Sequence, residues 1–106
     1  MLMTKSYIAD HWSILRVKKD HGLPVDEELD IFEKEIQDVP VKMLSELYRI
    51  NGEMFPIHDL IVDSNDLEKL GRWTKDLLRL NAERVRVRSE VGKVFGDFLE
   101  YKTYER

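Results

Sequence analysis

The sequence contains no cysteine, and among its 106 residues there are only five glycines and three prolines. Without cysteine the chain has no disulfide scaffold, no thiolate zinc site and no cysteine nucleophile. Few glycines and prolines favour helices over turn-rich β structure. No stretch approaches 18 apolar residues, and the first dozen residues lack the apolar core of a signal peptide. We therefore expect a cytoplasmic protein that does not enter a membrane.

Hydrophobic residues make up 42% of the chain and charged residues 36%. This hydrophobic content is too high for a disordered chain, and the length corresponds to about one domain. The net charge of −4 is uneven: residues 1–65 carry 7 basic and 13 acidic side chains, and residues 66–106 carry 10 and 8. We predict a single helical domain over residues 1–106, with short helices in 1–63 and one long helix over 64–102.

The N-terminal part shows three helical patterns. Thr4 is a plausible N-cap for a first helix that ends near His21-Gly22. A second apolar stripe with helical spacing lies between Pro24 and Pro40. We predict a third helix from about residue 40 to residue 50, because Asn51-Gly52 is a stop signal and Pro56 then breaks the helical pattern. A short helical turn is predicted over residues 57–62.

The long C-terminal helix carries a heptad pattern. Residues 64–66 offer N-caps, and Asn65 with Glu68 has the spacing of a capping box. Steps of three and four residues from Leu70 meet apolar or aromatic side chains at nine of ten positions, which is the period of a coiled coil. The positions are Leu70, Trp73, Leu77, Leu80, Arg84, Val87, Val91, Val94, Phe98 and Tyr101.

The apolar face of this helix is wider than a two-stranded coiled coil needs. It is extended by Leu78, Val85, Phe95 and Leu99. A face of this width is typical of a helix in a bundle with two or more neighbours. We therefore predict an all-α bundle of three to four helices, in which the last helix packs on the N-terminal helices, on another subunit, or on both.

A basic row lies on the same helix at every seventh position, formed by Arg72, Arg79, Arg86 and Lys93. Such a row suggests contact with nucleic acid. Each basic residue is followed four positions later by an acid, however, and these spacings permit ion pairs within the helix. A solvated, salt-bridged face is therefore the favoured interpretation of the row.

Arg84 is the one charged residue in the heptad pattern. Three interpretations are open. Its stem packs at the edge of the apolar face while its head stays in water, or it pairs with an acid and fixes register or partner choice, or it binds a ligand.

The pair His58-Asp59 resembles the core of an HD-type metal-dependent phosphohydrolase. That resemblance implies an upstream histidine ligand, for which His21 is available, and a downstream aspartate such as Asp63, Asp66 or Asp97. It covers only a few residues, and Leu60 and Ile61 replace the small and basic residues that usually follow the pair. Three polar histidines near helix ends are the simpler interpretation.

No glycine-rich phosphate loop, nucleophile motif or helix-turn-helix signature is present. We therefore predict a non-enzymatic protein–protein interaction module, such as an adaptor, inhibitor or assembly subunit, that self-associates through its C-terminal helix and needs no cofactor. A nucleic-acid accessory protein and a small phosphohydrolase are the alternatives.

Overall fold

The chain folds into an all-α bundle, as the sequence predicts. The computed structural model describes residues 4–63 and 65–96, except for the side chains of Asp59, Val62 and Asp63. Within these residues there are four helices and no strand. They are α1 (Lys5–Asp20), α2 (Asp26–Glu35), α3 (Val41–Asp63) and α4 (Leu67–Phe95). In the described part of the chain, no helix has both the length and the apolar character required to cross a membrane.

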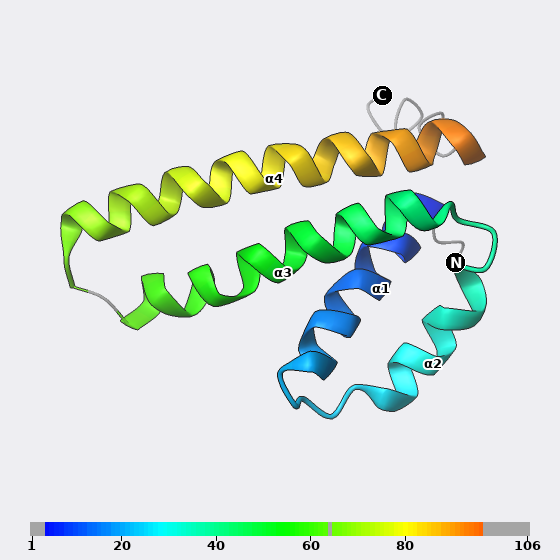
Figure 1. The fold of residues 1–106 in the computed structure, drawn as a ribbon, viewed down its shortest axis with the longest axis horizontal. Coiled ribbons are helices and arrows are strands. Elements are labelled where there is room, and N and C mark those ends of the chain that lie inside the picture. Colours follow the sequence, from blue (N-terminus) through cyan, green and yellow to red (C-terminus); the bar gives the residue numbers. More distant parts are fainter. Residues whose placement is uncertain (1–3, 64, 97–106) are drawn as a thin grey trace, which may run out of the picture.

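The two longest helices, α3 and α4, form an antiparallel hairpin (Figure 1). α1 lies across the hairpin and contacts both of its helices, whereas α2 packs against α1. The half of the hairpin next to the α3–α4 connection extends beyond α1 and α2 (Figure 1). We call this part, residues 53–63 and 67–79, the projecting arm. It explains why the radius of gyration, 15.2 Å, exceeds the roughly 13 Å of a compact domain of this length.

The predicted ends of α1 are confirmed. The Thr4 side chain accepts a hydrogen bond from the backbone N–H of Tyr7, which satisfies one donor of the first helical turn. α1 ends at Asp20, and Gly22 follows with a left-handed φ of 81°. Glycine takes this conformation without the steric penalty that a side chain would bring.

The acidic helix α2 faces the basic side of α1. Ion pairs join Lys19 to Asp26 at 3.2 Å and Arg16 to Glu33 at 3.9 Å. The Leu29 side chain is 2% exposed and anchors α2 to the rest of the fold. These ion pairs and the burial of Leu29 hold α2 against α1.

The prediction that the third helix stops at Ile50 is wrong. α3 continues through Asn51-Gly52 and Pro56, and the short helix predicted over 57–62 is its last part. An interior proline costs about 3 kcal/mol and an interior glycine about 1 kcal/mol. Packing offsets these costs, because Met54 is buried and Ile57 packs against the core. The local stop signals are thus overridden by tertiary contacts.

The N-cap of α4 is one of the three residues that the sequence offered. It is Asp66, rather than Asn65 of the predicted capping box, and its Oδ1 accepts hydrogen bonds from the backbone N–H groups of Glu68 and Lys69. At the other end, Phe95 is the last helical residue, and Gly96 follows with a left-handed φ of 78°. The predicted extension to residue 102 falls on residues 97–106, which lie outside the described part of the chain.

One core cluster joins α1, α3 and α4. It contains Ala9 from α1, four apolar residues of α3, three of α4 and Val39 from the α2–α3 connection. Within α3 these residues are Leu44, Leu47, Ile50 and Met54, and within α4 they are Leu80, Val87 and Val91. The core therefore lies where α1 crosses the hairpin, and the projecting arm contributes Met54 to it, with Ile57 and Leu77 packed against it.

Candidate interaction surface

The predicted heptad positions of α4 fall into three groups. Leu80, Val87 and Val91 are at most 1% exposed, because α1 and α3 cover them. Leu70, Trp73, Leu77 and Arg84 are half-buried, and Val94 is 55% exposed. Phe98 and Tyr101 lie outside the described residues. The central part of the pattern is thus used inside the chain's own core, and the coiled-coil interpretation stays a prediction.

A second apolar side of α4 is open to solvent. The exposed fractions of Leu67, Leu78 and Val85 are 82%, 66% and 50%. At 100° per residue these three side chains lie roughly opposite Leu80 and Val87, which face the core. The sequence indicated Leu78 and Val85 as extensions of the apolar face. Leu67 was not predicted as part of this face, although it lies eleven residues before Leu78, and a spacing of eleven residues places two side chains on the same side of a helix.

Arg84 pairs with an acid of the same chain. Its Nε lies 3.7 Å from Oδ1 of Asp10, and Nη1 of Arg88 lies 3.7 Å from Oδ2 of the same carboxylate. The Asp10 side chain is 9% exposed and that of Arg84 is 24% exposed. Of the three interpretations, pairing with an acid is therefore the one observed, and it links α1 to α4.

Two residues that sequence reasoning missed complete this polar cluster. Nδ2 of Asn51 donates hydrogen bonds to Asp10 Oδ1 at 3.0 Å and to Ser13 Oγ at 2.7 Å. The Ser13 hydroxyl donates to the Asp10 backbone carbonyl at 2.6 Å and is completely buried. The cluster therefore joins α1, α3 and α4. This cluster is visible only in the folded structure, because the sequence indicates Asn51 as a helix stop and Asn51 lies 41 residues from Asp10.

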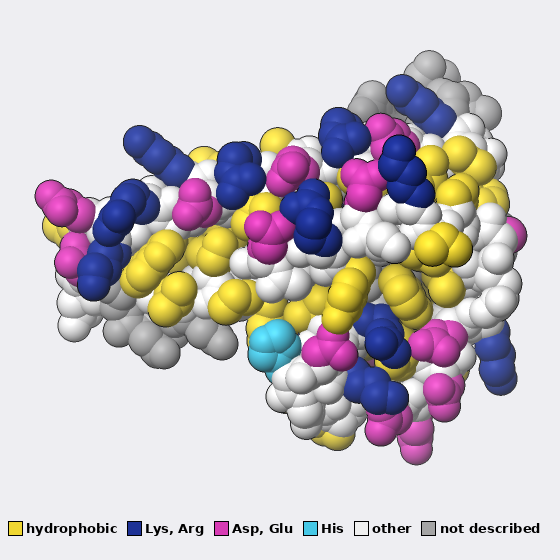
Figure 2. Space-filling view, viewed as in Figure 1, with side chains coloured by type: hydrophobic (Ala, Val, Ile, Leu, Met, Phe, Trp, Pro, Cys, Tyr) yellow, Lys and Arg dark blue, Asp and Glu magenta, His cyan; other side chains and the backbone are white. Residues whose placement is uncertain are grey.

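The basic row of α4 is exposed and partly neutralised. Arg79 lies 3.6 Å from Glu83, and Arg86 lies 3.0 Å from Glu90 and 3.4 Å from Glu46 of α3. Figure 2 shows basic and acidic side chains alternating along α4 on the face in view. Arg72 and Lys93 form no ion pair with any residue that the structure describes. Two of the four predicted pairs are thus present, and Asp97, the predicted partner of Lys93, is not described.

Of the histidines proposed for a metal site, His21 follows α1 and His58 lies on α3. His21 Nδ1 hydrogen-bonds to the Val17 carbonyl at 2.8 Å, and its ring contacts Phe55 with centroids 4.4 Å apart. His58 is exposed, and Asp59 lies next to it with a side chain outside the description. Among the described residues, no group of three or more histidine and acidic side chains is placed to hold a metal ion. The metal site remains a prediction.

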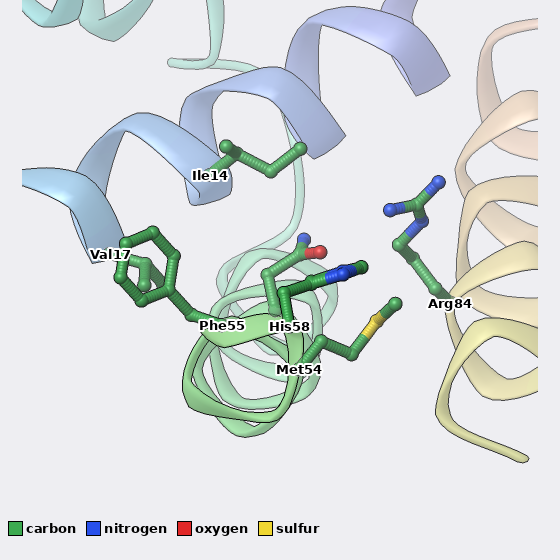
Figure 3. Close-up of a pocket in the computed structure, with 7 residues that line it drawn as sticks. Ile14, Val17, Met54, Phe55, His58 and Arg84 are labelled. Carbon is green, nitrogen blue, oxygen red and sulfur yellow. The ribbon is translucent and has the colours of Figure 1, made fainter. Parts of the chain in front are cut away.

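His58 instead borders a small pocket between α1, α3 and α4 (Figure 3). The pocket has a volume of about 120 Å³ and mostly apolar walls. Its lining residues are Ile14, Val17, Asn51, Met54, Phe55, His58 and Arg84. This volume is well below the 300 Å³ at which pockets for drug-sized ligands begin, so the pocket offers room for little more than a single side chain.

Two ionisable groups away from α4 have shifted pKa values. A hydrogen bond from Lys5 Nζ, 2.9 Å from Asp38 Oδ1, lowers the pKa of the Asp38 carboxyl below its usual value. The Tyr48 hydroxyl donates to the Asp20 carboxylate, and this bond raises the pKa of Tyr48. The first interaction joins the start of α1 to the α2–α3 connection, and the second joins the end of α1 to the interior of α3, so both link α1 to its neighbours.

The comparisons with known proteins identify no relative. No protein-family model, curated protein or solved structure matches this chain.

Proposed function

We propose that this chain is a non-enzymatic helical assembly module that self-associates through α4. The observation that carries the proposal is the exposure of Leu67, Leu78 and Val85 on the side of α4 opposite the core. Large exposed side chains that line up on one helix mark interaction surfaces more often than isolated ones do. Complete burial of a leucine contributes about 1.5–3 kcal/mol relative to exposure, so covering this side favours association.

The first experiment is a measurement of molar mass by light scattering on a sizing column, for the wild type and for Leu78→Glu. Leu78 is 66% exposed, so glutamate there does not enter the core. The matched control is Val41→Glu. Val41 is 76% exposed in the first turn of α3, where a carboxylate is favourable to the helix dipole. Circular dichroism checks that both variants keep the helical fold.

The expected result is a wild-type oligomer that Leu78→Glu dissociates and Val41→Glu leaves intact. A monomeric wild type over the whole concentration range would refute self-association. An oligomer that survives Leu78→Glu would place the contact on another surface.

A nucleic-acid accessory role is the second candidate, favoured by Arg72 and Lys93, which have no ion-pair partner among the described residues. Ionic strength separates the two functions. If a single strand is bound through four phosphate contacts, raising the salt from about 50 to about 200 mM should weaken binding about fiftyfold. Association through the uncharged side of α4 should persist over the same range, because apolar burial is not screened. Binding of a single-stranded oligonucleotide that falls steeply with salt would favour the second role.

A further inference from the structure

The exposed side of α4 is a stripe of seven uncharged residues. Starting from Leu67, successive steps of 4, 3, 4, 4, 3 and 4 residues reach Ser89, and all seven side chains lie within about 40° of the direction of the middle one, Leu78. The stripe consists of Leu67, Gly71, Thr74, Leu78, Ala82, Val85 and Ser89. Every one of these residues is exposed in the structure. A run of about 33 Å along a highly charged helix therefore carries no charge.

The spacing of the stripe is symmetric about Leu78, because the steps read the same in both directions. The residue sizes complement one another under this symmetry. Gly71 and Val85 lie seven residues to either side of Leu78, and Leu67 and Ser89 lie eleven residues to either side. If two copies of α4 pack antiparallel with the two-fold axis at Leu78, the two Leu78 side chains meet each other, Leu67 meets Ser89, and Val85 meets Gly71 of the other copy. Closed dimers are built from such self-complementary surfaces.

We infer that the partner of this surface is a second copy of the chain, whose α4 packs antiparallel on the first with Leu78 at the two-fold axis and Val85 of each copy over Gly71 of the other. The inference rests on the proposed function and specifies its geometry. A Cβ at Gly71 would meet no atom within 4 Å apart from its chain neighbours and the nearby backbone of its own helix, so a neighbouring helix has room to approach there. An uncharged strip also accepts an equally uncharged strip without desolvating a charge.

The estimated contact area indicates a weak dimer. Two helices about 12 Å wide that touch over about 33 Å bury on the order of 800 Å² in total. This is below the area of standard stable interfaces, so we expect weak, reversible association. Association is therefore measured at chain concentrations from about 5 to about 500 µM.

Cysteine cross-linking tests the antiparallel register, and the absence of native cysteine makes each introduced thiol unique. Leu78→Cys should form a disulfide-linked dimer under mild oxidation, because the two residues meet at the axis. Ser89→Cys should not, because the two copies of residue 89 lie about 33 Å apart and a disulfide spans less than about 7 Å. Cross-linking of both variants would show a parallel arrangement and overturn the inference. Cross-linking of neither, with an associating wild type, would also overturn it but leave self-association standing.

Exchange of large and small residues tests the contact between Gly71 and Val85. Gly71→Val should raise the dissociation constant at least about tenfold, because the added side chain collides with Val85 of the second copy. The double variant Gly71→Val with Val85→Ala should restore association by returning a small residue opposite the large one. Gly71→Val should leave the monomer at least as helical as the wild type, because valine has the higher helix propensity.

The outcomes separate the two proposals. If Leu78→Glu dissociates the dimer but Gly71→Val does not weaken it, the chain self-associates through α4 in another register. If the wild type is a monomer at the highest concentration, self-association is refuted, and the antiparallel geometry that depends on it is refuted as well.

Discussion

Asn51 of α3 donates a hydrogen bond to the Asp10 carboxylate of α1 at 3.0 Å, and both residues are 6% exposed. Two arginines of α4 complete the cluster, since Arg84 and Arg88 each lie 3.7 Å from the same carboxylate. The cluster is therefore the polar point at which all three core helices meet. A buried polar group is costly when it loses its partner, so these residues fix how α1 crosses the hairpin.

Asn51→Ala should lower the free energy of unfolding by about 1–3 kcal/mol, because it removes the two buried hydrogen bonds that the Asn51 amide donates to Asp10 and Ser13. Asn81→Ala is the matched control, since Asn81 is exposed on α4 and makes no interaction in the described structure. Its effect should stay within about 0.5 kcal/mol. Urea unfolding followed by circular dichroism measures both. Equal effects of the two substitutions would argue against a structural role for the cluster.

Val87 and Val94 occupy the same heptad pattern but have opposite surroundings. Val87 is completely buried, so Val87→Ala should destabilise the fold by about 2 kcal/mol through lost apolar burial and a cavity. Val94 is 55% exposed, so Val94→Ala should change stability by less than about 0.5 kcal/mol. Thermal or urea unfolding of the two variants provides the comparison. Comparable losses would mean that the pattern packs as one continuous seam.

Pro56 lies inside α3, where it removes a backbone hydrogen bond. Pro56→Ala should therefore raise the free energy of unfolding by about 1–3 kcal/mol, because the bond to the Gly52 carbonyl becomes available. Pro40→Ala is the control, since Pro40 precedes α3 and interrupts no helix. No gain from Pro56→Ala would indicate that the helix is broken at this residue.

Asp38 should contribute to the acid dependence of stability. The hydrogen bond from Lys5 lowers the folded-state pKa of Asp38. Its contribution is therefore present above the unfolded-state pKa and is lost as the pH falls through the folded-state pKa. Asp38→Asn should remove this part of the stability loss below about pH 4.

Unfolding at pH 7 and pH 3 measures the effect. Asp30→Asn serves as the control, because Asp30 is exposed on α2 and has no described partner. The prediction is contradicted if Asp38→Asn and the wild type lose equal stability on acidification.

The fold class followed from the sequence because helical periodicity is a local property. The spacing of Thr4 and His21-Gly22 located α1 closely, since caps and left-handed glycines act within one turn. The prediction for α3 was wrong because Asn51-Gly52 and Pro56 disfavour a helix locally, and only this local effect is visible in the sequence. The packing of Met54 and Ile57, which outweighs it, involves residues far away along the chain.

The candidate surface was only partly predictable. The heptad starting at Leu70 indicated a wide apolar face, but the spacing did not say which residues face this chain's own core. The structure buries Leu80 and Val87 and leaves Leu78 and Val85 exposed. That division depends on where α1 and α3 lie, because a helical periodicity gives the relative angles of side chains and not the positions of neighbours.

The sequence by itself determined an all-α chain, a long charged final helix and the absence of cysteine chemistry, because composition and spacing act along the chain. Only the tertiary structure decided that α3 is continuous, that Asp10 and Asn51 meet across 41 residues, and that one side of α4 stays uncovered. These features depend on the path of α1 across the hairpin. That path is set by long-range packing, in which many weak contacts outweigh the local cost of a glycine or a proline.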